Sequence, residues 1–399
     1  MNAGSAAISL ANAKSKAQAG LVTLILFSLG HFFVDLYSGS LGVMQPYLIN
    51  RFSLSLTQAG LLGGLLVFSS SVTQPLYGYL SDRMRSRFFS ALGPMVAGVF
   101  ILGSSLMPGY SWAVASMMLG GAGVSAFHPQ ASSWAALGMK RDRAMWMSVF
   151  ISAGTLGIAL APAFFKEVIT RAGFERIVWA AVPGVAVTIL LVILAREPAE
   201  AAAMASRAFD WPALRSVWKP LSILYFGVFF RSAVQVTYSQ FLVLYLSRER
   251  GYSIHAAAYT LTAYLTAGAI GGFLGGHLSD RIGARRLIVV SFALSIPFMA
   301  LFFVTPSTIG VVSLVLGGLI LLFSIPVNVV VAQQLVPTQA ATVSALLMGF
   351  AWGAAGMIFI PATGWLADRT SLHTALSLLL IFPVLGWALA RHLPEDLGR

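Results

Sequence analysis

Long apolar segments recur from one end of this chain to the other, and they restrict its fold more than any other feature. We identify twelve of them, separated by short polar stretches. A hydrocarbon core about 30 Å thick needs roughly 20 residues of helix, so each segment is long enough to cross a membrane. They run approximately over 19–48, 56–80, 88–107, 111–138, 144–166, 174–195, 219–246, 255–279, 286–304, 308–334, 341–366 and 372–391. The pattern predicts an all-α membrane protein with twelve transmembrane helices.

The composition agrees with this class of protein. Of the 399 residues, 58% are hydrophobic and 10% are charged, whereas soluble domains carry roughly a quarter charged residues. The net charge is +12, but the basic residues lie in short runs between apolar segments, so we expect no nucleic-acid partner. The absence of cysteine excludes disulfides and thiolate metal sites. The first apolar segment is too long for a signal peptide and is expected to remain as the first helix.

The distribution of Lys and Arg predicts the orientation of the chain. Basic residues concentrate before the first segment, where Lys14 and Lys16 lie, and in the stretches 83–87 and 140–143. Cytoplasmic loops carry an excess of Lys and Arg, so both termini are expected in the cytoplasm. We therefore expect a multi-pass protein of the bacterial cytoplasmic (inner) membrane, surrounded by lipid and acting as a monomer.

The longest polar break divides the chain into two halves of six segments each. Residues 1–195 would form an N-terminal bundle, 196–218 a cytoplasmic linker and 219–399 a C-terminal bundle. Trp211, Arg215 and Trp218 suit a short helix lying on the inner membrane surface, and a flexible linker is the alternative. Two such halves predict two pseudo-symmetric six-helix bundles, as in transporters built from internal repeats.

A repeated motif supports this internal symmetry. Gly78 to Arg83 ends the second segment, and Gly276 to Arg281 ends the eighth, 198 residues later. A third copy, Gly364 to Arg369, ends the eleventh segment on the opposite side. Glycine permits close helix approach, Asp can accept hydrogen bonds from a helix start in the other half, and Arg can pair across a gate. We therefore assign gating to the residues Gly78, Asp82, Arg83, Gly276, Asp280 and Arg281.

The first two copies resemble the signature loop of the major facilitator superfamily. Three further stretches, His31 to Tyr37, Gln58 to Gly78 and Phe127 to Ala131, resemble the fosmidomycin-resistance type within it. That resemblance implies a major facilitator fold and drug/proton antiport. One position departs from the type, because Gln130 stands where an acidic residue commonly follows the His-Pro pair.

His31 and Asp35 are the candidate proton-coupling residues. They lie four residues apart, so their side chains share one face of the first helix. Ionisable groups at membrane depth are costly and usually face water or a polar partner. Such a pair would titrate as a coupled unit and carry a proton. The alternative is a structural pair that ties the first helix to a neighbour.

Arg231 is the candidate anion-binding residue. It lies within the seventh segment, where an Arg needs an anion, a cluster of carbonyls or water. It would pair with Asp35 or hold an anionic group of the substrate. The alternative is an Arg whose head reaches the membrane surface from near a helix end.

A break in the fourth segment predicts further cavity-lining residues. His128 precedes Pro129, and Pro bends a helix by freeing a carbonyl. Pro326 lies at the repeat offset from His128 in the tenth segment. Besides Arg231 and His128, the candidate substrate-binding residues are Gln130, Tyr37, Gln45, Gln74, Gln235 and Asn328.

No enzyme signature is present in the sequence. It lacks a phosphate-binding loop, which argues against drive by ATP, and we expect no cofactor. The histidines lie in different segments without ligand spacing, so we predict no metal site. The prediction is a proton-coupled exporter of a small anionic or amphipathic compound, such as a drug or a phosphonate, working by alternating access. Proton-coupled uptake of a small organic anion is the alternative, and a membrane sensor or scaffold without transport is a third.

Overall fold

The computed structural model describes residues 3–84, 86, 88–137, 143–195 and 211–395, and these are helical almost throughout. The first half contains α1 (Ala3–Ser38), α2 (Leu41–Phe52), α3 (Leu56–Val67), α4 (Gln74–Met84), α5 (Phe88–Ala91), α6 (Gly93–Gly103), α7 (Tyr110–Leu137), α8 (Arg143–Ala172) and α9 (Val182–Leu194). Short 3-10 segments, η2 (Ser104–Leu106) and η3 (Glu175–Ala181), extend two of these helices.

The second half follows the short helix α10 (Trp211–Ser216). It contains α11 (Trp218–Glu249), α12 (Ile254–Ile282), α13 (Ala284–Val304), α14 (Thr308–Leu321), α15 (Ser324–Leu335), α16 (Ala340–Ser344), α17 (Trp352–Arg369), α18 (Leu372–Leu378) and α19 (Ile381–Ala390). The 3-10 segment η5 (Pro337–Gln339) precedes α16. Most of the predicted linker, residues 196–210, lies outside the described residues. Its last part is α10, with Trp211 exposed.

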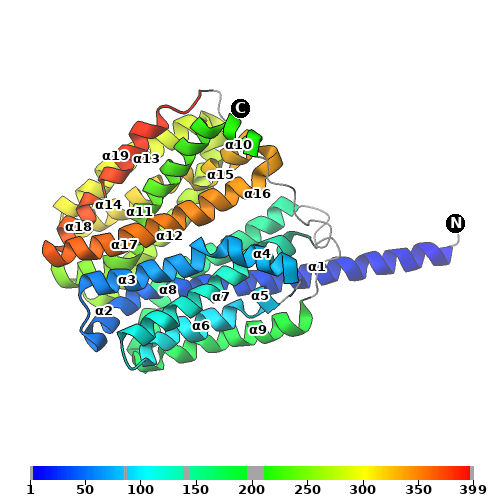
Figure 1. The fold of residues 1–399 in the computed structure, drawn as a ribbon, viewed down its shortest axis with the longest axis horizontal. Helices are drawn as coiled ribbons and strands as arrows, with labels where there is room; N and C mark the ends of the chain where they lie inside the picture. The colour runs from blue at the N-terminus through cyan, green and yellow to red at the C-terminus, as the bar shows by residue number, and fades with distance from the viewer. Residues whose placement is uncertain (1–2, 85, 87, 138–142, 196–210, 396–399) are drawn as a thin grey trace.

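The helices form two bundles, α1 to α9 in one and α11 to α19 in the other (Figure 1). Eleven segments in the described part of the chain are long and apolar enough to cross a membrane. The remaining long helix, α7, occupies the place of the fourth predicted segment and is less apolar because it carries serines, glycines, His128 and Gln130. This confirms the predicted all-α fold of twelve membrane helices in two pseudo-symmetric bundles.

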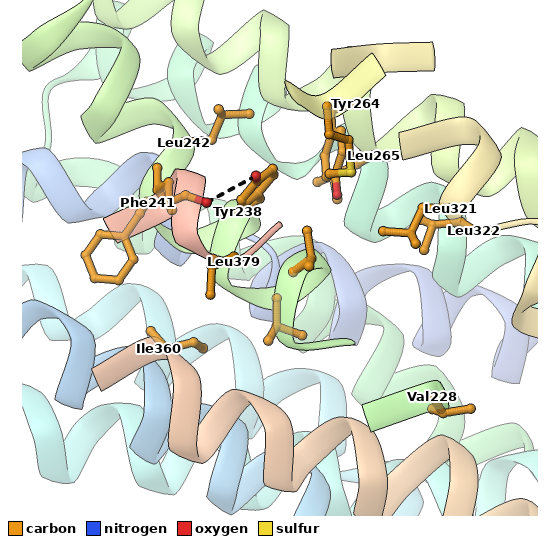
Figure 2. Packing of buried hydrophobic residues seen from close by; sticks show 14 of the residues in the cluster. Val228, Tyr238, Phe241, Leu242, Tyr264, Leu265, Leu321, Leu322, Ile360 and Leu379 are labelled. Carbon is orange, nitrogen blue, oxygen red and sulfur yellow. Dashed lines mark hydrogen bonds between the residues drawn. The ribbon is translucent and has the colours of Figure 1, made fainter. Parts of the chain in front are cut away.

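Each bundle has its own apolar core. In the second bundle Tyr238, Tyr264, Leu321 and Leu322 are almost fully buried, and the Tyr238 hydroxyl donates to the Leu376 carbonyl oxygen at 3.3 Å (Figure 2). Burying apolar side chains between helices does not drive packing in lipid as it does in water, so close van der Waals fit and such polar contacts hold the helices together.

The two bundles meet most extensively along α3 and α17, which lie side by side at their boundary (Figure 1). Each of these helices widens into a π-helical turn near the boundary, η1 (Phe68–Val72) after α3 and η6 (Ala345–Ala351) before α17. Such turns inside α-helices occur frequently at functional sites.

Small residues bring the two bundles close at one end. A Cβ on Gly364 would lie 2.2 Å from the Leu56 carbonyl oxygen, and one on Gly42 would lie 2.1 Å from that of Ser239. Only glycine fits such contacts between helix backbones. We call this the clamped end; it holds the start of α3 and the end of α17.

Candidate functional site

Asp35 lies between two histidines inside the first bundle. Its Oδ2 is 3.3 Å from Nε2 of His31, one turn earlier on α1, and its Oδ1 is 3.3 Å from Nε2 of His128 on α7. The ligating atoms of the three side chains all lie within 4.8 Å of one another. We call these three residues the triad. The predicted His31–Asp35 pair is therefore part of a larger group, and His128 joins it rather than standing apart as a substrate contact.

The second ring nitrogen of each histidine is also held. Nδ1 of His31 lies 2.8 Å from the Phe150 carbonyl oxygen on α8, and Nδ1 of His128 lies 2.8 Å from that of Val124. The ring of Phe150 stacks on His31, with centroids 4.3 Å apart. A carbonyl oxygen only accepts, so each Nδ1 must carry a hydrogen. This leaves each Nε2 to interact with Asp35.

Gly154 on α8 forms one wall of the triad. A Cβ at this position would lie 2.3 Å from Nε2 of His31 and 2.6 Å from Oδ2 of Asp35. A Cβ on Gly157, one turn later, would lie 2.2 Å from the Phe32 carbonyl oxygen. The small-residue stretch of α8 thus lets this helix approach α1 and covers the buried charges.

The exposed fraction of the side chain increases from His31 to Asp35 to His128. The side chains of His31, Asp35 and His128 are 10%, 13% and 24% exposed. His128 is the member with the most contact to the outside. Groups of Asp, Glu and His side chains inside membrane helices often mark proton relays.

The triad bears on the prediction that the protein has no metal site. The sequence predicts no metal site because the histidines lie in different segments, yet the fold brings two of them to one carboxylate. Spacing along the chain did not reveal this, since His128 comes from another helix. Such a trio could in principle hold a metal ion. Each imidazole, however, faces its own carboxylate oxygen, which is the arrangement of two separate hydrogen bonds.

Arg231 lies in the second bundle on α11 and is 5% exposed. Its Nε and Nη1 have no hydrogen-bond partner, and no described acidic side chain pairs with it. The Tyr264 hydroxyl on α12 is also buried without a hydrogen-bond partner. Both amide atoms of Asn328, on α15, are buried without a partner. The three helices that carry these groups, α11, α12 and α15, pack against one another.

The structure does not pair Arg231 with Asp35. Within the described residues the ion-pair partners of Asp35 are the two histidines. The buried position of Arg231 also differs from that of an Arg reaching the membrane surface. An unpaired guanidinium in such a place requires a ligand anion or water.

Other predicted cavity residues have different surroundings. The Tyr37 hydroxyl donates to the Ala180 carbonyl oxygen at 3.1 Å and accepts from the Gly184 N–H at 2.9 Å, deep in the first bundle. Gln130 accepts from the Ser90 hydroxyl at 2.6 Å and donates to the Ser86 carbonyl oxygen at 3.1 Å. Both side chains are occupied by holding helices together.

The three other glutamines predicted to bind substrate, Gln45, Gln74 and Gln235, differ in the hydrogen bonds that they make. The amide nitrogens of Gln45 and Gln74 donate to the carbonyl oxygens of Ala59 and Ser70. The Oε1 atoms of Gln45 and Gln235 are buried without a partner. Gln45 and Gln235 therefore each retain an acceptor that a ligand or water can satisfy.

The motif copies behave differently at the two ends of the molecule. At the clamped end Asp368, in the third copy, accepts from the N–H groups of Leu56 and Thr57, both at 2.8 Å. At the opposite end Gly78 and Gly276 have only Pro129 and Pro326, of their own bundles, within 4 Å of a Cβ. The predicted contact of the motif Asp with a helix start of the other bundle is thus seen in the third copy, and the gating role of the first two copies stays a prediction.

The described contacts of the remaining gating residues lie within their own bundles. Arg83 donates to the Tyr79 hydroxyl, four residues earlier, at 3.2 Å. The side chain of Asp82 lies outside the described part of the structure. Asp280 and Arg281 line a cavity of about 700 Å³ within the second bundle, together with Arg285, Arg286 and Pro326.

Comparison with known proteins agrees with this architecture. The family model described as "Major Facilitator Superfamily" matches residues 27–358 and 221–397. The chain is 31% identical to an uncharacterized MFS-type transporter, YfnC, of Bacillus subtilis, over 94% of this chain and 93% of the other. It is 27% identical to the fosmidomycin resistance protein of Escherichia coli, over 96% and 95%.

Solved structures show the same fold. A bacterial homologue of the human lysosomal transporter Spinster superimposes with a TM-score of 0.77 at 19% identity, covering 93% of this chain and 95% of the other. A mutant of the nucleoside transporter NupG gives 0.76 at 14% identity, covering 94% and 100%. The helical architecture, the paired bundles and these matches lead to one conclusion: the chain belongs to the major facilitator superfamily and is a membrane transporter.

Proposed function

We propose that this transporter couples proton movement to the export of a small anionic or amphipathic compound. The observation that carries the proposal is Asp35, a carboxylate buried in a membrane helix and enclosed by two imidazoles. A buried carboxylate is costly in a membrane and is retained there for proton or ion pathways. The N-terminal bundle, residues 1–195, would carry the proton, and the C-terminal bundle, residues 219–399, would bind the substrate.

In this proposal Arg231 is the residue that binds the substrate. Its charge lacks a partner in the described structure, and the unpaired polar atoms of Tyr264 and Asn328 lie on helices packed against α11. An anion bound there would satisfy the guanidinium through charge-assisted hydrogen bonds. The similarity to the fosmidomycin resistance protein supports a drug or phosphonate as substrate and export as direction.

We further propose that the clamped end faces the outside of the cell. An excess of Lys and Arg in the loops of the opposite end supports a cytoplasmic position for that end and for both termini. The structure would then be closed toward the outside and open toward the cytoplasm. Rocking of the bundles would release the clamp formed by Asp368 and engage the motif copies at the cytoplasmic end.

The proposal is tested by replacing Asp35 with Asn in protein reconstituted into liposomes. We would measure fosmidomycin movement driven by a pH gradient, with a gradient-free sample of the same liposomes as reference. The expected result is loss of gradient-driven movement while fosmidomycin still binds. Unchanged coupling in Asp35→Asn would remove the proton assignment.

Uptake by proton symport is the second candidate. It is favoured by similarity to a probable hexose phosphate transport protein of Chlamydia pneumoniae, at 23% identity over 68% of each chain, since sugar phosphates are anions. The sign of the response separates the candidates. In an antiporter the substrate moves in the direction opposite to the protons, and in a symporter it moves in the same direction as the protons.

A further inference from the structure

The geometry of the triad points to its proton capacity. We propose that the triad binds two protons, one in each of its two N···O pairs, and that His128 exchanges them with water. This inference rests on the proposed proton coupling and adds its stoichiometry and its entry point.

Two backbone carbonyls determine where the histidine rings carry their hydrogens. Because Phe150 and Val124 each accept from an Nδ1, both histidines carry a hydrogen on Nδ1. A neutral imidazole of that form presents a lone pair at Nε2. The lone pair would face a carboxylate oxygen 3.3 Å away, and two acceptors repel. A proton in each N···O pair converts this repulsion into a charge-assisted hydrogen bond.

The two pairs are independent positions. Oδ2 of Asp35 serves His31 and Oδ1 serves His128, so a single proton cannot satisfy both pairs. With both positions filled the triad carries one positive charge, and with both empty it carries one negative charge. The two states differ by two protons.

No other ionisable group of the described residues takes over this role. α6 and α9, which pack against α1, contain no ionisable residue. The ionisable residues of α8 lie toward its two ends: Arg143 is at the start, roughly 16 Å along the helix from Gly154, and Lys166 is roughly 18 Å beyond Gly154. Tyr37 on α1 is occupied by Ala180 and Gly184. His128 is therefore the ionisable neighbour that reaches Asp35 from another helix.

The exposure of the side chains gives the route. His31 is stacked under Phe150 and is covered by Gly154 together with Asp35, whereas the His128 side chain is 24% exposed. Because His128 has the largest exposed fraction of the three, we infer that a proton enters there and passes by way of Asp35 to His31. His128 therefore controls exchange, and His31 holds the inner proton.

The test counts protons on the imidazoles directly. The chain has six histidines, so protein labelled with 15N at histidine gives a small set of ring-nitrogen resonances. Spectra would be recorded near neutral pH with a chelator, so that the nitrogens report protons and not a bound cation. Signals are assigned with His31→Gln and His128→Gln, and His277→Asn, at an exposed position on α12, serves as the matched control.

We expect two imidazoles, those of His31 and His128, to be protonated on both nitrogens in the wild-type protein. Both should lose this state in Asp35→Asn, because the neutral amide removes the negative charge that holds the two protons, while its nitrogen can still donate to one Nε2. His277→Asn should leave both unchanged. A single doubly protonated imidazole, or none, would overturn the inference even if Asp35 proved essential for coupling. If Asp35→Asn abolishes coupling but the wild type lacks these two signals, proton coupling through Asp35 stands and the two-proton inference fails.

Discussion

Asp368, at the end of α17, accepts from both the N–H and the hydroxyl of Thr57 at the start of α3, at 2.8 and 2.5 Å. One carboxylate thus caps a helix of the other bundle, and it accepts from the Leu56 N–H as well. The first backbone N–H groups of a helix have no partner within the helix, and their dipole favours a negative charge. Asp368 is therefore a main polar contact between the bundles, beside the glycine contacts at this end and the pair of Glu167 with His255.

Replacing Asp368 with Asn should weaken the clamp. Loss of a capping interaction costs about 1 kcal/mol, which is roughly a fivefold change in the equilibrium between closed and open states. Because the chain contains no cysteine, Leu106→Cys and Val304→Cys can carry spin labels without background. These exposed positions lie at the clamped end, one in each bundle. We expect a larger population of long label distances in Asp368→Asn.

The control for the clamp is Glu175→Gln. This residue pairs with Arg51 at 2.8 Å within the first bundle and makes no contact of this kind with the second. The distance distribution should remain that of the wild type. An unaltered distribution in Asp368→Asn as well would show that the glycine contacts alone close this end.

Gly154→Ala should disrupt the triad. The added methyl group would overlap His31 and Asp35, and overpacking of this kind costs typically about 1–3 kcal/mol. We expect a lower melting temperature and loss of proton-driven transport. Gly103→Ala is the matched control, since a Cβ there meets nothing within 4 Å. Equal melting temperatures for the two variants would contradict the packing described for Gly154.

Arg231→Ala should weaken anion binding without lowering the stability of the protein. Removing a buried charge without a partner should leave the ligand-free protein as stable as the wild type or more stable. Charge-assisted hydrogen bonds contribute about 1.5–3 kcal/mol, so binding of an anion should weaken at least about tenfold. Thermal shift with fosmidomycin and with inorganic phosphate measures both quantities.

The control for Arg231 lies on the same helix. Arg248→Ala changes an exposed Arg near the end of α11 and should alter neither binding nor stability. Anion binding that survives in Arg231→Ala would remove this residue from the substrate site.

Gln130→Glu should make stability depend on pH. Its acid form can donate to the Ser86 carbonyl oxygen as the amide does, whereas its carboxylate would face that oxygen at about 3.1 Å. The protonated form is therefore favoured in the folded state, and the stability it contributes is present at low pH and lost as pH rises. Melting temperatures of variant and wild type should converge in acid and diverge in alkali. A constant difference would mean that the Ser86 contact is unimportant.

The sequence predicts the fold well because membrane helices follow from length and hydropathy. It also identifies His31, Asp35 and Arg231, since ionisable residues are conspicuous in apolar segments. It does not place His128 beside Asp35, because contact between helices depends on packing that no spacing along one helix records. The surroundings of Tyr37 and Gln130 were missed for the same reason. Asp368 belongs to a motif copy singled out in the sequence, but its contacts, like those of Gly154, become visible only in three dimensions.

The separation of the charges has an electrical consequence. Asp35 lies in one bundle and Arg231 in the other, and the described interior of the second bundle holds no acidic side chain to neutralise Arg231. Rocking bundles that carry buried charges moves charge through the electric field of the membrane, and each elementary charge that crosses fully gains about 2.3 kcal/mol per 100 mV. The voltage of the membrane would therefore act directly on the conformational step. Reorientation of the empty carrier should carry a measurable current.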